Sequence, residues 1–114
     1  MSSDPRKIVA TYFDSWKRHD FETFRSNLAD DVVFDGPMGH VDNADDCTEA
    51  IKRLAGMMTN LVVTKVFVDG PDVLIWYDMH TAKTGAMPIA NWCHVENGKI
   101  SRIRVAFDPR PLLA

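Results

Sequence analysis

The sequence is poor in the features that mark several large classes of protein. Its longest apolar runs, such as Val73–Tyr77, are far shorter than the ~20 residues that a membrane-spanning helix needs. The 13 Lys and Arg residues are interspersed with 16 Asp and Glu residues, which leaves no basic stripe to neutralise phosphate groups. We therefore expect no membrane span and no nucleic-acid partner.

Cysteine and glycine motifs are equally scarce. The two cysteines, Cys47 and Cys93, show no CxxC or metal-ligand spacing, and the N-terminal segment MSSDPRK lacks the apolar core of an export signal. No GxGxxG, P-loop or GxSxG string occurs, so nothing indicates a nucleotide cofactor or a serine nucleophile. These absences predict a cytoplasmic protein with reduced cysteines, no metal and no cofactor.

What is present indicates one small folded domain. The chain has 114 residues, of which 46% are hydrophobic and 25% are charged, an ordinary balance for a globular protein with a single core. Because no linker or repeat interrupts the sequence, we expect residues 1–114 to form a single domain.

Two helices are predicted at the start of the chain. Asp4 is placed to cap the first helix, with Pro5 at its first position. A second helix is expected to begin after Asp20 and to end at Asp30–Asp31, before a short strand at 32–34. The apolar faces of these helices comprise Ile8, Tyr12 and Trp16 in the first and Phe21, Phe24 and Leu28 in the second.

A third helix and a run of strands complete the predicted domain. Asp45 or Asp46 is expected to cap the helix, since Glu49 completes a capping box with Asp46. Its apolar face comprises Cys47, Ile51, Leu54 and Met58. Strands are predicted at 61–68, 73–81, 87–96 and 100–107, and Asn97–Gly98 is the strongest hairpin signal. Helices followed by an antiparallel meander predict an α+β domain, with the helices on one face of a curved sheet that encloses a conical apolar pocket.

The order of four strings in this chain resembles the nuclear transport factor 2-like superfamily, and within it the SnoaL-like polyketide cyclases and ketosteroid-isomerase-like proteins. The strings are IVATYFDSW, DFETFRSNLADDVVF, HVENGKISRIRV and FDPRPLL. The resemblance implies three N-terminal helices on a strongly curved, mostly antiparallel sheet of the cystatin-like type. The fold hosts isomerases, cyclases, epoxide hydrolases and non-catalytic binding modules, so it does not fix an activity.

The resemblance also implies roles for individual residues. Tyr12 matches the tyrosine that donates to the oxyanion in ketosteroid isomerases, and Asn91 falls at or beside their second donor. The position of the isomerase base falls on Gly36, so a proton carrier has to come from Asp35, one residue earlier, or from His40 at the pocket mouth. Because side chains alternate along a strand, Asp35 is expected to face away from the pocket unless a bulge rotates it inward.

Three functions follow as alternatives. The leading hypothesis is a cofactor-free pocket protein that binds a small apolar carbonyl compound and acts on it as an isomerase or cyclase by proton transfer. A non-catalytic protein that binds a hydrophobic ligand, or an accessory protein, is the alternative. An epoxide-hydrolase-like enzyme is a further alternative, although Ile75, Tyr77 and Val105 stand where that activity needs two aspartates and an arginine.

The remaining predictions concern the ligand pocket and the outer face of the sheet. Trp76 and Trp92 are expected on that outer face, where they are costly to leave in water, so we expect a homodimer through it. A protein-interaction domain working through the same face is another possibility. The expected ligand-binding residues are Trp16, Phe34, Met38, Leu54, Met58, Ile75, Tyr77, Met79, Cys93, Val105 and Phe107.

Overall fold

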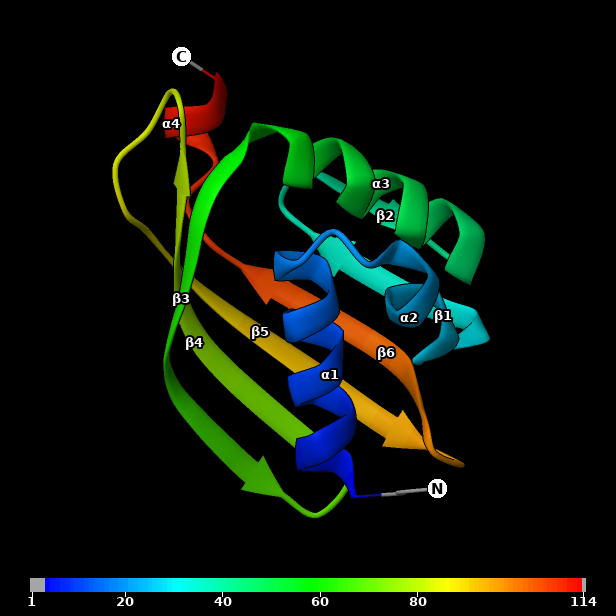
Figure 1. Cartoon of the computed structure of the whole chain (residues 1–114). Coiled ribbons are helices and arrows are strands. Elements are labelled where there is room, and N and C mark those ends of the chain that lie inside the picture. Colours follow the sequence, from blue (N-terminus) through cyan, green and yellow to red (C-terminus); the bar gives the residue numbers. More distant parts are fainter. Residues whose placement is uncertain (1–3, 114) are drawn as a thin grey trace.

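Helices cover one face of a single curved sheet in the computed structural model, which describes residues 4–113 (Figure 1). The elements are α1 (Pro5–Lys17), α2 (Phe21–Ser26), β1 (Leu28–Gly36), β2 (Gly39–Val41), α3 (Ala44–Met57), β3 (Met58–Asp69), β4 (Asp72–Thr81), β5 (Met87–Glu96), β6 (Lys99–Ala106) and α4 (Arg110–Leu113). The six strands form one sheet in the order β2-β1-β6-β5-β4-β3. Within the described residues, no helix is both long and apolar enough to cross a membrane.

The predicted α+β fold is confirmed, with a fourth short helix added at the C-terminal end. All neighbouring strands pair in an antiparallel manner except β1 and β6, which run parallel. The sheet curves around α1, while α3 lies over the β1–β2 end (Figure 1).

Side-chain capping explains where the long helices begin. The Asp4 carboxylate accepts a hydrogen bond from the Arg6 backbone N–H, as the sequence predicts. Helix α3 differs, because its cap is Asn43, whose side-chain oxygen accepts from the Asp46 N–H. The prediction of Asp45 or Asp46 as the cap was wrong by two or three positions, since both carboxylates lie in the first turn of the helix.

Several boundaries around the first strand were also predicted wrongly. Helix α2 ends at Ser26, so Leu28, which was predicted for the apolar face of this helix, is instead the buried first residue of β1. The pair Asp30–Asp31 lies inside β1, where the pairing with β6 is irregular between Leu28 and Val33. The β1–β2 hairpin and α4 had no counterpart among the predicted elements, and Met58 begins β3 instead of extending α3.

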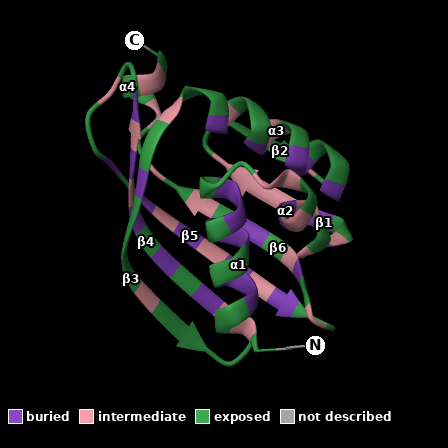
Figure 2. Ribbon diagram, viewed as in Figure 1, coloured by how far each residue is buried: buried purple, intermediate pink, exposed green. Residues whose placement is uncertain are grey.

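The core lies between α1 and the concave face of the sheet (Figure 2). Burial alternates along β4, where Val73, Ile75, Tyr77 and Met79 are buried and the intervening residues are partly or fully exposed. Phe13 of α1 packs edge-on against Tyr77, with ring centroids 5.1 Å apart. Helix α1 therefore covers part of the concave face, and the cavity lies along the rest.

Candidate functional site

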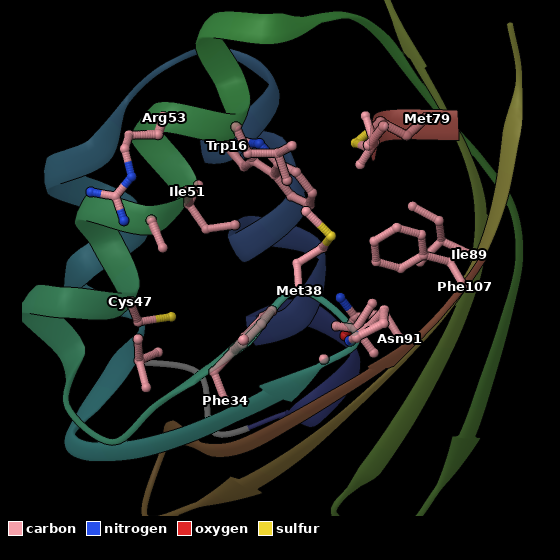
Figure 3. Close-up of a pocket in the computed structure, with 18 of the residues that line it drawn as sticks. Trp16, Phe34, Met38, Cys47, Ile51, Arg53, Met79, Ile89, Asn91 and Phe107 are labelled. Carbon is pink, nitrogen blue, oxygen red and sulfur yellow. The ribbon is translucent and has the colours of Figure 1, made fainter. Parts of the chain in front are cut away.

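A cavity of about 630 Å³ lies between the sheet, α1, α3, the β1–β2 turn and the C-terminal segment (Figure 3). Its wall is largely apolar, and the polar side chains in it come from α1, β2, α3, β4 and β5. Met38, on the β1–β2 turn, is 54% exposed and extends its side chain into this space. The residues of the wall are Tyr12, Trp16, Phe34, Gly36, Pro37, Met38, Gly39, His40, Val41, Cys47, Ala50, Ile51, Arg53, Leu54, Met57, Tyr77, Met79, Ile89, Asn91, Val105, Phe107 and Leu112.

Two polar groups of α1 are enclosed without a partner. Tyr12 and Trp16 lie one helical turn apart, with ring centroids 6.4 Å apart, and both belong to the cavity wall. The Tyr12 hydroxyl and the Trp16 indole N–H are buried and have no hydrogen-bond partner among the described residues. A buried polar group without a partner costs about 1–3 kcal/mol, and such exceptions call for an explanation such as a bound molecule.

Asn91 brings an amide group next to these aromatic side chains. Burial raises the pKa of Tyr12 well above its usual value, and an interaction with the Asn91 side chain acts in the opposite direction. The interaction between Tyr12 and Asn91 is not a hydrogen bond of normal geometry, because the Tyr12 hydroxyl has no hydrogen-bond partner among the described residues. The pKa of Tyr77 is likewise raised by burial and lowered in part by Asn91. Both phenols therefore remain protonated at ordinary pH and can donate hydrogen bonds.

The two acid–base candidates differ in their position relative to the cavity wall. Asp35 is absent from the cavity wall, although its neighbours Phe34 and Gly36 belong to it. Its carboxylate instead pairs with His40 Nδ1 across the β1–β2 hairpin, and this hydrogen bond lowers the pKa of Asp35. The alternation rule therefore holds here, and no bulge turns Asp35 inward. His40 does contribute to the wall, but its ring shares the face of the hairpin with Asp35.

Charged groups are few in the wall, and no carboxylate is among them. Arg53 is exposed and lies on the α3 flank of the cavity with Ala50 and Met57. Burial raises the pKa of the Cys47 thiol to about 12, so this wall residue is a thiol and a poor nucleophile at neutral pH. Among residues 4–113, no three His, Cys, Asp or Glu side chains gather as a metal site would require.

Most predicted site residues meet in this one cavity. Tyr12, Asn91 and His40 do, as do eight of the predicted ligand-binding residues, which are Trp16, Phe34, Met38, Leu54, Tyr77, Met79, Val105 and Phe107. Asp35, Met58, Ile75 and Cys93 do not belong to the wall. Ile75 and Cys93 lie one inward position beyond Tyr77 and Asn91 on their strands, at the point where α1 fills the concave face. Met58 is displaced because α3 ends before it.

Other wall residues were not predicted as ligand contacts. Ile89 continues the inward series of β5 with Met87 and Asn91, so strict alternation could have identified it. Ala50 and Arg53 belong to α3, and Leu112 belongs to α4. Ala50 lies at helical spacing from Cys47 and Leu54, so the helical period could have identified it. Arg53 and Leu112 carry no such signal, because a charged residue and a residue of the C-terminal segment do not follow the apolar pattern.

Comparison with known proteins shows which family and which folds the chain is similar to. A family model for the SnoaL-like domain matches residues 9–103, whereas no curated protein is significantly similar in sequence. An NTF2-like protein of unknown function from Cytophaga hutchinsonii is 27% identical, with a TM-score of 0.89 over 100% of this chain and 98% of that one.

Two more distant structures share the fold. An LEH-like epoxide hydrolase from M. tuberculosis is 18% identical, with a TM-score of 0.78 over 94% of this chain and 84% of that one. A hypothetical protein with a ketosteroid isomerase-like fold from Catenulispora acidiphila, in complex with trimethylamine, is also 18% identical, with a TM-score of 0.72 over 86% and 82% of the two chains. At this identity the likeness concerns the fold alone.

Proposed function

The chain belongs to the SnoaL-like domain family, and on that premise we propose that it binds a small, largely apolar carbonyl compound in the cavity, with Tyr12 and Asn91 at the carbonyl oxygen. One observation carries this proposal. The Tyr12 hydroxyl belongs to a residue of the cavity wall, is fully buried, and has no hydrogen-bond partner among the described residues.

A carbonyl ligand fits the chemistry of this site. A neutral phenol and an amide N–H are donors, and a carbonyl oxygen accepts hydrogen bonds without bringing a proton of its own. The apolar wall supplies the rest of the binding free energy, since burying apolar surface contributes about 25 cal/mol per Å². Met38 is flexible and extends into the cavity, so it can move aside and give a ligand access to the polar groups.

Isothermal titration with 1-tetralone tests the proposal, and tetralin serves as the matched hydrocarbon. We expect the ketone to bind more tightly than tetralin, and Tyr12→Phe to weaken ketone binding by about three- to tenfold, which is the net value of one hydrogen bond. Tetralin binding should stay within twofold. Equal binding of 1-tetralone to the native chain and to Tyr12→Phe would contradict the proposed role of Tyr12.

Proton transfer on the bound carbonyl compound is a second candidate function, as in an isomerase or a cyclase. It is favoured by one observation, namely that His40 contributes to the cavity wall while Asp35 holds its Nδ1 atom. In this reaction the free imidazole nitrogen would take a proton from the carbon beside the carbonyl, and Tyr12 and Asn91 would stabilise the enolate oxygen.

Deuterium exchange distinguishes catalysis from binding. Under this second hypothesis, the protein accelerates exchange of the C2 protons of 1-tetralone in D₂O, and His40→Gln abolishes the acceleration without changing ketone affinity. Exchange at the buffer rate in the native chain would leave a binding protein as the function. An epoxide-hydrolase activity has less support, because Ile75, Tyr77 and Val105 provide neither carboxylate nor guanidinium groups.

We also propose that two copies associate through the outer face of the sheet. Val62, Phe67, Leu74 and Trp76 form an apolar patch on β3 and β4, and each of them is more than 40% exposed. The register pairs Phe67 with Leu74 and places Trp76 one position further along this outer face. A contiguous exposed patch of this kind marks an interaction surface, and a second copy presents a matching apolar surface about a twofold axis.

A further inference from the structure

A thiol lies directly behind the amide that the proposed function uses. Asn91 and Cys93 occupy successive inward positions of β5, and both side chains are buried. The Cys93 Sγ atom donates to Asn91 Oδ1, with 3.3 Å between the sulfur and the oxygen.

The cross-strand neighbours offer these two groups no polar partner. Cys93 pairs across the sheet with Val73 and Ile103, and Asn91 pairs with Ile75 and Val105. All four neighbours are apolar. The thiol therefore has the amide oxygen as its acceptor, and burial raises the pKa of Cys93, so the sulfur keeps the proton that it donates.

The orientation of the amide decides what the phenols can do. With Oδ1 held by Cys93, the NH₂ group is the part of the amide left to act on the Tyr12 and Tyr77 oxygens, in keeping with the lowering effect of Asn91 on the pKa of both phenols. Each phenol oxygen can then accept from the amide while its own proton stays available. In the opposite orientation, Oδ1 would accept the phenol protons and leave none for a ligand.

We propose that Cys93 is a positioning residue that holds the Asn91 amide with its N–H groups toward Tyr12 and Tyr77, so that this end of the cavity donates hydrogen bonds and selects ketones over the corresponding alcohols. The inference rests on the proposed function, because it specifies how the same site distinguishes ligands. A ketone only accepts, whereas an alcohol also brings a hydroxyl proton that finds no acceptor in such a site.

The ratio of affinities for 1-tetralone and 1-tetralol measures this selectivity, and titration calorimetry supplies both values. In the native chain the ketone should bind about three- to tenfold more tightly than the alcohol. Cys93→Ala removes the donor and frees the amide to rotate, so the ratio should fall to within twofold of one. Cys93→Ser is the matched control, since its hydroxyl keeps a donor at the same place, and it should preserve the native ratio.

Two outcomes overturn the inference while leaving the proposed function intact. In the first, Cys93→Ala keeps the native ratio of affinities for 1-tetralone and 1-tetralol, while Tyr12→Phe still weakens ketone binding. The other is an equal loss of the ratio in Cys93→Ala and Cys93→Ser, which would indicate a packing role. Failure of the native chain to bind 1-tetralone, or indifference of ketone binding to Tyr12→Phe, would instead overturn the proposed function and the inference with it.

A measurement on the native chain keeps the inference testable if Cys93→Ala does not fold. Nuclear Overhauser effects from the Asn91 side-chain amide protons should reach the rings of Tyr12 and Tyr77. Effects from those amide protons to the Cys93 β-protons, with none to either ring, would show the opposite orientation and refute the inference.

Discussion

Removing the Tyr12 hydroxyl should make the protein more stable and its ligand binding weaker. In the folded chain this oxygen is buried without a hydrogen-bond partner, whereas in the unfolded chain water solvates it. Desolvation without compensation costs about 1–3 kcal/mol. Tyr12→Phe removes this cost and keeps the ring, which packs against Phe13 and Phe24 with centroids 5.1 and 4.8 Å away.

Two smaller losses reduce the gain. The void left by one oxygen atom costs roughly a few tenths of a kcal/mol, at about 24 cal/mol per Å³. The interaction with Asn91, which partly lowers the pKa of Tyr12, is also lost, and we assign it roughly half the value of an ordinary hydrogen bond, about 0.5 kcal/mol. The net expectation is a free energy of unfolding higher by about 0.5–2 kcal/mol, which corresponds to a Tm higher by roughly 3–10 °C.

Urea unfolding of the ligand-free protein, followed by circular dichroism, measures this difference. Tyr77→Phe is the control, because the Tyr77 hydroxyl is not among the buried groups that lack a partner, and it should bring no such gain. If Tyr12→Phe unfolds at a lower urea concentration than the native chain, the hydroxyl has a hydrogen-bond partner in solution, and the reasoning from an unpartnered donor fails.

Two further predictions concern the opposite face of the sheet. His94 Nδ1 lies 2.7 Å from Asp72 Oδ1, and the hydrogen bond between them is the main cause of the raised pKa of His94. The stability that this pair contributes is fully present below the ordinary imidazole pKa of about 6.5. It is lost as the pH rises through the raised pKa of the folded state. The difference in urea midpoint between the native chain and His94→Gln should therefore shrink from pH 5.5 to pH 8.5, and a difference that stays constant would contradict this role. Trp76→Glu places a charge in the exposed apolar patch and should yield a monomer in light scattering after size-exclusion chromatography. Binding of 1-tetralone should be unchanged in this variant. Lys65→Glu, which changes the exposed polar residue paired with Trp76, should remain a dimer. An unchanged mass for Trp76→Glu would refute the proposed interface.

Local signals in the sequence determined most of the architecture. Period-two burial in β4 and β5 follows directly from their apolar alternation. The Asn97–Gly98 turn adopts φ values of 52° and 75°, as an Asn-Gly hairpin requires. Period and turn chemistry act over a few residues, so they can be read without knowing what packs on the segment.

The errors lie where several local signals compete. The stretch from Asn27 to Asp31 contains polar and acidic residues that suit a helix end as well as an edge strand, and pairing with β6 decides in favour of the strand. At α3 three residues that can cap a helix, Asn43, Asp45 and Asp46, occur within four positions, and the side chain that accepts from a free backbone N–H is that of Asn43. Such choices depend on contacts with residues about 70 positions away or on the exact direction of the entering chain.

The sequence alone determined the family resemblance, the inward faces of the strands, and the pairing of Tyr12 with Asn91 as candidate groups at one carbonyl. The tertiary structure decided which of these residues reach open space, because α1 fills the half of the concave face beneath Ile75 and Cys93, whereas α3 and the β1–β2 turn stand away from the other half. It also decided that Asp35 stays outside the wall while it pairs with His40, which belongs to the wall, and that the Cys93 thiol donates to the Asn91 amide oxygen. Period and spacing fix the face of an element on which a side chain lies, but the distance to the next layer is set by how all the layers pack together.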